Sequence, residues 1–277
     1  TAQLLETGKD LIQQGLDRAL KRNTLIMEGA DVYIPPLYYS EMGVARLLKQ
    51  IATNPLQTVP IAVDRAIAWL ERRYSLTLSD EQKDAVCKAV SAKVLVITGG
   101  PGTGKTTIIR SLLDVFEQKG LSVGLAAPTG RAAKRMAAAT GREAKTIHRL
   151  LEFSPQTGAF TRDDSNPLRL DMLVVDECSM VDVVLMYQLL KAVPPAARLV
   201  FVGDVDQLPS VGPGTVLFDI ISSGTIPVVW LKTVFRQAAE SGIITNAHRV
   251  NQGMYPEFNT RDFFFVERRD PESAGKT

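Results

Sequence analysis

The sequence contains few of the residues from which metal centres and disulfide frameworks are built, and it lacks long apolar runs. It has two cysteines and two histidines in 277 residues. Cys87 and Cys178 are far apart and lack metal-like spacing, so we expect reduced thiols in an intracellular, cytoplasmic protein. No apolar run approaches the roughly 18 residues that a membrane helix needs, and the N-terminus lacks the basic-then-apolar order of a signal peptide. The sequence therefore predicts no membrane partner.

Neither positive nor negative charge is in large excess. The net charge is +2, which is too weak to predict nucleic-acid binding by itself, so any DNA contact has to come from local basic clusters. The composition, 45% hydrophobic and 22% charged, is typical of a globular protein with one large or two small cores. The chain has no initial Met and stops at "DPESAGKT" without a terminating element, so we expect a fragment.

Residues 1–75 differ in pattern from the remainder. Apolar residues recur at roughly helical spacing up to about residue 20, and two short strands are expected about a turn at 28–31. Further helices are predicted over Ser40–Ala52 and Ile61–Tyr74. The prediction is a helical or winged-helix-like N-terminal domain. Such modules bind DNA about as often as they serve as protein-contact or spacer domains.

From about residue 79 onward, short apolar runs alternate with helical segments, which predicts an α/β fold with a parallel sheet covered on both faces. In such sheets the chemistry gathers beyond the carboxyl ends of the strands. The predicted strands are "VLVIT" (94–98), "LSVGLAA" (121–127), "MLVVD" (172–176), "RLVFVG" (198–203) and "IPVVWL" (226–231).

A phosphate-binding loop lies between the first predicted strand and a helix over Thr106–Lys119. "GGPGTGKT" satisfies the pattern G-x-x-x-x-G-K-[ST], with Gly99 as its first residue. Glycines let backbone N–H groups turn toward phosphates, and the helix N-terminus adds its positive end. Lys105 is expected to reach the β- and γ-phosphates and Thr106 to ligate Mg²⁺. The nucleotide-binding residues predicted here are Gly100, Pro101, Gly102, Thr103, Gly104, Lys105, Thr106 and Thr107.

An acidic pair follows the strand "MLVVD", as it does in many phosphate-loop proteins. Asp176 is expected to hold Mg²⁺, and Glu177 to orient and deprotonate the attacking water. The alternative is a solvated strand end. Cys178, the next residue, is interpreted as a small side chain that fills space.

Five segments taken in order resemble the motif series of superfamily-one DNA helicases, and most of all the RecD/TraA type, which includes the exodeoxyribonuclease V alpha subunit. They are "GGPGTGKTT", "AAPTGRAAKRM", "VVDECSM", "VGDVDQLPSVGPG" and "VFRQ". The resemblance covers residues 76–270. It implies an ATP-driven DNA translocase or helicase with a RecA-like lobe over 76–255, whose full-length parent moves 5′ to 3′ along single-stranded DNA. Other recombination or repair subunits are implied as partners.

The same resemblance assigns further residues to ATP. Gln207, in "GDVDQLP", would touch the γ-phosphate, and an uncharged amide can follow a phosphate that leaves without binding it too firmly. Arg236, in "VFRQ", would contact the γ-phosphate as well. Gln82 matches the family's adenine-recognising glutamine, although Ser79 and Gln82 also fit a helix capping box.

Three segments are predicted by the resemblance to contact the DNA backbone, and a hairpin over about 151–165 stands where relatives carry a strand-separating pin. Phe153 or Phe160 could serve as the wedge, and a plain surface excursion is equally compatible with this hairpin. The DNA-contact residues are Pro128, Thr129, Gly130, Arg131, Thr146, His148, Pro209, Val211 and Gly212.

Residues 256–277 resemble the lead-in to a second motor lobe, so we expect this chain to bind nucleotide, hydrolyse it poorly and not unwind DNA. Two other classes stay open. A non-motor phosphate-loop ATPase, kinase or ATP-gated interaction module would leave "GDVDQLP" without a role. A DNA-binding accessory protein resting on residues 1–75 would leave Lys105 and the acidic pair unexplained.

Overall fold

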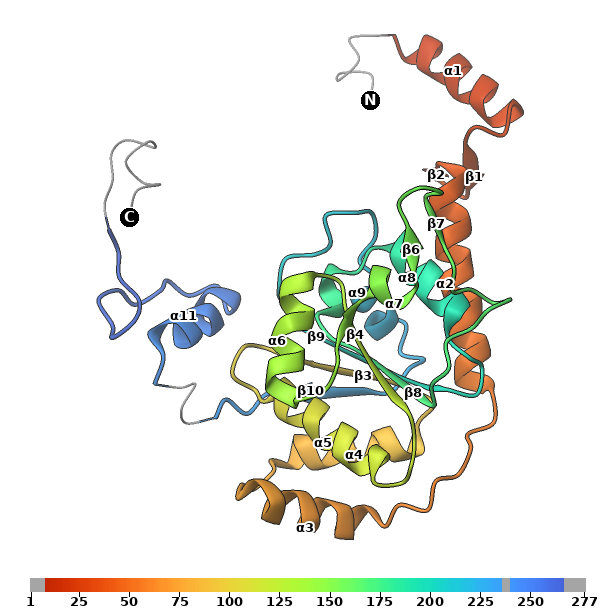
Figure 1. Cartoon of the computed structure of the whole chain (residues 1–277). Coiled ribbons are helices and arrows are strands. Elements are labelled where there is room, and N and C mark those ends of the chain that lie inside the picture. The colour runs from red at the N-terminus through yellow and green to blue at the C-terminus, as the bar shows by residue number, and fades with distance from the viewer. Residues whose placement is uncertain (1–7, 236–239, 267–277) are drawn as a thin grey trace.

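A six-stranded parallel sheet forms the centre of the protein (Figure 1). The computed structural model describes residues 8–235 and 240–266. The strand order is β10-β3-β9-β8-β4-β5, and every neighbouring pair runs parallel. The predicted α/β class and parallel sheet are therefore confirmed. The strands are β3 (Val94–Gly99), β4 (Val123–Ala127), β5 (Lys145–Thr146), β8 (Met172–Val175), β9 (Arg198–Gly203) and β10 (Val228–Leu231).

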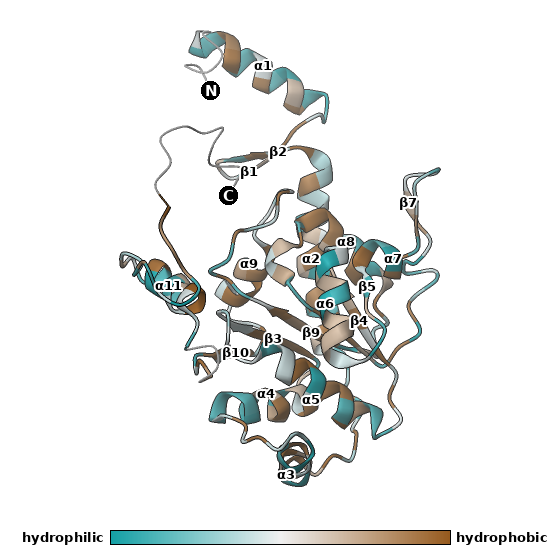
Figure 2. Ribbon diagram, turned by 60° about the vertical axis from the view of Figure 1, so that its left-hand side comes forward, coloured by the Kyte–Doolittle hydropathy of each residue, from teal (hydrophilic) through white to brown (hydrophobic). Residues whose placement is uncertain are grey.

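The central strands are apolar on both sides because helices cover both faces of the sheet. Alternate residues of β3 divide between two hydrophobic cores: Val94 and Val96 face one core, whereas Leu95 and Ile97 face the other. Figure 2 shows hydrophobic residues in the strands and alternating hydrophobic and hydrophilic residues in outer helices such as α3. The first core is closed by α2 (Pro35–Thr53), α8 (Val183–Ala192) and α9 (Val216–Ser222), and the second by α3 (Val63–Tyr74), α4 (Asp80–Ser91), α5 (Lys105–Glu117) and α6 (Gly130–Thr140).

Helices α2 and α3 belong to the cores of the sheet although both precede residue 75. Val44 and Leu48 of α2 lie in the first core, and Leu70 of α3 lies in the second. Helix α2 begins at Pro35, earlier than the predicted Ser40, because a proline favours the first turn of a helix. The hydrophobic core thus runs across the predicted domain boundary.

The elements before α2 extend away from the sheet (Figure 1). Helix α1 (Lys9–Lys21) has only exposed or half-buried residues. The predicted hairpin is present as β1 (Ile26–Glu28) and β2 (Asp31–Tyr33), joined by Gly29 at a φ of +59°. Among residues 8–235 and 240–266, helices long and apolar enough to cross a bilayer are absent.

Several smaller elements complete the described chain. Strands β6 (Phe153–Ser154) and β7 (Ala159–Phe160) form the hairpin expected at 151–165, next to the short helix α7 (Ile147–Leu150). A 3₁₀ turn covers Cys178–Met180 after β8, and α11 (Gly242–Asn251) follows β10. Strand β5 was not predicted, since two residues are too short to show an apolar pattern.

Candidate functional site: a nucleotide cavity beside a DNA-facing edge

The phosphate loop runs from the end of β3 into α5. Gly102 and Gly104 adopt φ angles of +78° and +84°, a left-handed conformation that glycine adopts without steric cost. The Lys105 ammonium donates hydrogen bonds to the carbonyl oxygens of Gly99 and, at 3.0 Å, Gly100. Burial lowers the pKa of Lys105, whereas the carboxylate of Asp204 acts in the opposite direction. The side chain of Lys105 is thus held against the backbone of its own loop.

The phosphate loop lines a cavity of about 700 Å³. This cavity contains all eight predicted loop residues together with Glu177 and Gln207, which come from the ends of two other strands. The sheet therefore brings together residues that are up to about 100 positions apart in sequence, at the carboxyl ends of its strands as expected. The lining residues are Gly100, Pro101, Gly102, Thr103, Gly104, Lys105, Thr106, Thr107, Arg135, Glu177, Gln207 and Phe235.

The acidic pair is buried at the end of β8. Asp176 is 5% exposed and Glu177 8% exposed. Glu177 has a φ of +54°, an uncommon backbone conformation for a residue other than glycine, and its N–H donates to Asp176 Oδ1 at 2.9 Å. Burial and then the Glu177 carboxylate raise the pKa of Asp176. Glu177 Oε2 is buried without a hydrogen-bond partner among the described residues, so it is available to a water or a ligand.

Arg135 of α6 reaches this acidic pair. Its guanidinium donates to Glu177 Oε1 and lies 3.8 Å from Asp176 Oδ2. The sequence did not predict a contact between Arg135 and Glu177, because that contact depends on how α6 lies beside β8. Its only sequence signal is the spacing from Arg131, four residues earlier on the same helical face.

Gln207 lies on the turn that follows β9. Its side-chain amide donates to Asp204 Oδ2 at 3.2 Å, and Asp204 is 2% exposed. The other Asp204 oxygen accepts from the N–H of Asp206 at 3.1 Å. Asp204 thus positions the glutamine at the edge of the phosphate cavity.

The side-chain amide of Gln82 uses its oxygen in a helix cap, whereas its nitrogen has no hydrogen-bond partner among the described residues. Its Oε1 accepts from the N–H of Ser79 at 3.1 Å while its own N–H donates to Ser79 Oγ at 3.3 Å, so the capping box is present. Its Nε2, buried beside Gly104, has no hydrogen-bond partner among the described residues. A buried unpaired amide N–H₂ fits a ligand acceptor such as a purine nitrogen.

Two residues that the sequence did not single out also contact the phosphate loop. The N–H of Phe235 donates to the Gly102 carbonyl at 3.2 Å, and His248 Nε2 lies 3.1 Å from the Pro101 carbonyl. Phe235 directly precedes Arg236, which itself lies outside the described residues. The contact of His248 has no sequence signal, because it depends on α11 folding back onto the loop.

The residues predicted to contact DNA fall into two groups on the structure. In the first, Thr129 caps α6 by accepting from Ala132 N at 3.2 Å, and Thr146 caps α7 by accepting from Arg149 N at 3.1 Å. Thr146 pairs in register with Ala127, which is followed by Pro128, so the segments around Pro128–Arg131 and Thr146 start side by side. His148 packs against the hairpin, with its ring 5.6 Å from Phe153 and 5.7 Å from Phe160.

The second group is the loop that follows Gln207. Leu208 is 86% exposed and Val211 is fully exposed, although both are apolar. Gly212 lies against Asp182, the N-cap of α8, so closely that a Cβ would come within 2.3 Å of its Oδ2. The loop thus exposes two apolar side chains, while Gly212 is closely packed against the start of α8.

A metal at this site would need ligands from its substrate. Among residues 8–235 and 240–266, groups of three or more His, Cys, Asp or Glu placed to hold a metal are absent. Thr106 lines the nucleotide cavity, and Asp176 directly precedes Glu177, which lines it as well. That sparse oxygen set fits Mg²⁺, which binds through one or two carboxylates, substrate phosphates and water.

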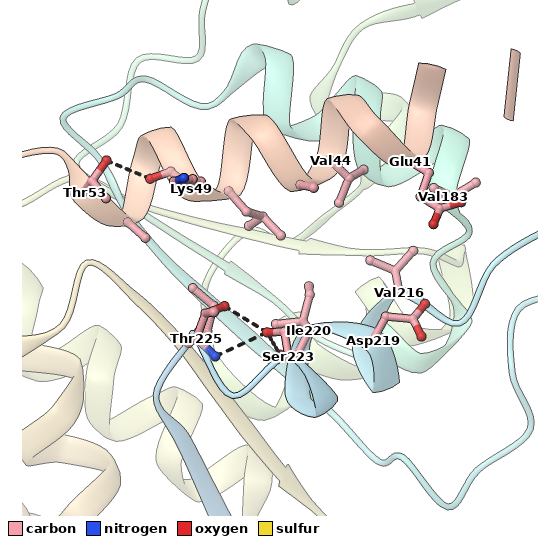
Figure 3. Close-up of a pocket in the computed structure, with 14 residues that line it drawn as sticks. Glu41, Val44, Lys49, Thr53, Val183, Val216, Asp219, Ile220, Ser223 and Thr225 are labelled. Carbon is pink, nitrogen blue, oxygen red and sulfur yellow. Dashed lines mark hydrogen bonds between the residues drawn. The ribbon is translucent and has the colours of Figure 1, made fainter. Parts of the chain in front are cut away.

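A second cavity, of about 600 Å³, lies between α2 and α9 (Figure 3). Apolar side chains such as Val44, Val216 and Ile220 line most of it, and Glu41 and Asp219 lie at one end. The predicted nucleotide, metal and DNA residues are all outside it. This cavity therefore lies outside the candidate nucleotide and DNA sites.

The proteins to which this chain is similar include DNA helicases. Residues 82–213 match the family described as an AAA domain. The chain is 39% identical over 236 residues to an ATP-dependent RecD2 DNA helicase of Deinococcus radiodurans, an alignment that covers 85% of this chain and 32% of the relative. It is 42% identical over 210 residues to the RecBCD enzyme subunit RecD of Mycobacterium tuberculosis, covering 66% of this chain and 36% of the relative.

A solved structure agrees with these relatives. The crystal structure of Pif1 helicase from Candida albicans matches with a TM-score of 0.50 and 27% identity, over 66% of this chain and 46% of that chain. The chain spans about a third of the length of the two curated relatives. The matched AAA domain begins at Gln82 and ends at Pro213, so it includes the phosphate loop, the acidic pair and Gln207.

Proposed function

The chain belongs to the RecD-type superfamily-one helicases, and from that premise we propose that it is an ATP-dependent motor lobe that binds Mg-ATP and single-stranded DNA. We place its work in DNA recombination or repair. The observation that carries the proposal is the meeting of Lys105, Glu177 and Gln207 in one cavity. The phosphate loop, the candidate base and the candidate phosphate-sensing amide are then within one bound nucleotide's reach.

Nucleotide binding is assigned to the phosphate loop and Gln82. The loop's N–H groups and the start of α5 suit the phosphates, because a helix N-terminus favours negative charge. Lys105 already points at the loop carbonyls and would exchange those bonds for phosphate oxygens. The free Nε2 of Gln82 is assigned to the adenine ring, while its Oε1 stays in the helix cap.

Metal binding is assigned to Thr106 and Asp176. A bound Mg²⁺ would neutralise charge on the β- and γ-phosphates as the phosphoryl group transfers. Asp176 lies at the end of β8, and its Oδ2 is 3.8 Å from Arg135, which lines the nucleotide cavity together with Lys105.

Turnover is assigned to Glu177, Gln207 and Arg236. Glu177 would accept a proton from the attacking water, for which its free Oε2 is suited. Gln207 would follow the γ-phosphate from its position on Asp204. Arg236 follows Phe235 directly in sequence, and Phe235 contacts the phosphate loop.

DNA binding is assigned to the exposed edge around the starts of α6 and α7 and to the loop after Gln207. Hydroxyls, backbone N–H groups and arginine suit phosphates and carry no sequence information. Thr129, Arg131 and Thr146 supply such groups in neighbouring segments. The exposed Leu208 and Val211 would add apolar contacts from the loop after Gln207. We also propose recombination or repair subunits as partners of this lobe, since one relative is named as a RecBCD enzyme subunit.

Steady-state ATP hydrolysis with and without a single-stranded oligonucleotide tests this function, with Lys105→Ala as the matched blank. A motor lobe is expected to bind Mg-ATP, to lose that binding in Lys105→Ala, and to change its nucleotide affinity or turnover when the oligonucleotide is added. Consumption of a small phosphate acceptor, with no response to DNA, would contradict the motor and favour a kinase.

A further inference from the structure

An ion pair joins the candidate general base to a helix whose start is assigned to DNA. Arg135 donates to Glu177 Oε1 and lies 3.8 Å from Asp176 Oδ2, and it lines the nucleotide cavity beside Lys105. Glu177 is buried whereas the Arg135 side chain is 63% exposed. Arg135 can therefore leave the pair for solvent far more easily than Glu177 can.

Helix α6 connects this pair to the DNA-facing edge. Its N-cap is Thr129, and Arg131 lies four residues before Arg135, on the same face of the helix. The opposite face is fixed in the second core by Ala132, Ala133 and Met136. Since a packed helix moves as a body, a displacement at Thr129–Arg131 is transmitted to Arg135 one turn away.

We propose that Arg135 is a positioning residue that restrains Glu177 and Asp176 when DNA is absent, and that DNA contact at the start of α6 withdraws it. This inference rests on the proposed function, since it needs both ligands to bind this lobe. Through Arg135, single-stranded DNA would control the nucleotide site.

The restraint has two physical effects. The guanidinium occupies Glu177 Oε1, so one of the two carboxylate oxygens is unavailable to a water. It also places a positive charge 3.8 Å from Asp176, the residue assigned to Mg²⁺, where a second cation is repelled. Both effects oppose the binding and use of Mg-nucleotide until Arg135 leaves. Because coupling between two ligands is reciprocal, bound nucleotide would also strengthen DNA binding.

The test measures the affinity of the 277-residue chain for a fluorescent, slowly hydrolysed ATP analogue with Mg²⁺, with and without oligothymidine. Arg135→Ala is compared with Lys134→Ala, a matched control because Lys134 is exposed on the same helix and forms no ion pair among the described residues. Wild type is expected to bind nucleotide more tightly with DNA. Arg135→Ala is expected to bind about tenfold more tightly without DNA, and to lose most of the DNA effect. Lys134→Ala keeps the wild-type effect.

A double-mutant cycle with Glu177→Gln isolates the pair. If Arg135 acts through the acidic residues, Arg135→Ala has a smaller effect on DNA-free affinity in a Glu177→Gln background than in wild type. Equal effects in the two backgrounds would overturn the inference. So would an Arg135→Ala chain that binds nucleotide more weakly with and without DNA, because Arg135 would then contact the phosphates directly.

The outcomes separate this inference from the proposed function. A wild-type chain that binds nucleotide and oligothymidine independently, or an Arg135→Ala chain that keeps the wild-type DNA effect, overturns the role of Arg135 and leaves the motor assignment in place. A wild-type chain that binds no oligothymidine, or whose nucleotide binding survives Lys105→Ala, overturns both.

Discussion

The side-chain amide of Gln207 donates a hydrogen bond of 3.2 Å to Asp204, a buried carboxylate at the end of β9. The bond holds the glutamine at the rim of the nucleotide cavity with its carbonyl oxygen still available. Gln207 is followed at once by the exposed loop at 208–212. One short turn therefore connects a buried strand, the phosphate site and a candidate DNA-contact loop.

Replacing Gln207 by Ala is expected to leave nucleotide binding nearly unchanged and to lower DNA-stimulated kcat by about five- to tenfold, the loss expected for one neutral hydrogen bond. Gln207→Glu is the matched contrast, because a second carboxylate beside Asp204 repels both Asp204 and phosphate. It should raise the dissociation constant for nucleotide. Titration of both variants with labelled nucleotide decides the point: equal weakening by Ala and Glu would place Gln207 in ground-state binding.

Glu177→Gln is expected to reduce ATP turnover by about 10²- to 10⁴-fold, the contribution typical of a general base, while nucleotide affinity stays within a few-fold of wild type. The amide keeps the shape of the side chain and accepts a hydrogen bond from Arg135, but it cannot take up a proton. Single-turnover hydrolysis together with a binding titration separates the two effects. Turnover that persists in Glu177→Gln would move the base to another residue.

Gly212→Ala is expected to lower the free energy of unfolding by about 1–3 kcal/mol, because its new Cβ would lie within 2.3 Å of Asp182 Oδ2 in a packed site. Displacement of the loop would also weaken oligonucleotide binding. Gly15→Ala is the control. It lies in exposed α1 with open space around it, and alanine favours a helix over glycine by about 0.5–1 kcal/mol. Denaturant unfolding of both variants is the measurement, and equal stability of the two would contradict tight packing at Gly212.

Glu71, which lies outside the candidate site, is expected to make the stability of the fold depend on pH. The N–H of Leu78 donates to its Oε1 at 3.0 Å and lowers the pKa of Glu71 below its ordinary value of 4.5, and Lys83, at 3.3 Å, acts in the same direction. The ionised form is therefore favoured by folding, so its stabilisation is present above the ordinary pKa and is lost as pH falls through the lowered one. Glu71→Gln should reduce the Tm at pH 7 and converge with wild type in acid.

Thermal unfolding across that pH range, with Glu143→Gln as an exposed control, measures the Glu71 effect. Glu143 forms an ion pair with Lys145, at 3.5 Å, and is largely exposed. A Tm difference between wild type and Glu71→Gln that stays constant down to strongly acid pH would mean that packing, rather than the charge, carries the contribution.

The sequence by itself determined the elements whose signals are local. Continuous apolar runs predict buried parallel strands, and all five predicted runs form strands of the central sheet. The glycines and Lys105 of the phosphate loop lie within eight consecutive residues, so their arrangement follows from local backbone geometry. The acidic pair directly follows β8 and Gln207 lies on the turn after β9, and parallel strands bring their carboxyl ends to one edge.

The tertiary structure decided the contacts that depend on strand order and on the packing of helices. Arg135 and Glu177 are 42 residues apart, and they meet only because β4, which leads into α6, pairs with β8. The contact of His248 with the phosphate loop and the burial of α2 and α3 against the sheet have the same origin. The periodicity of a segment reports which face is apolar, but it carries no information about which distant segment covers that face.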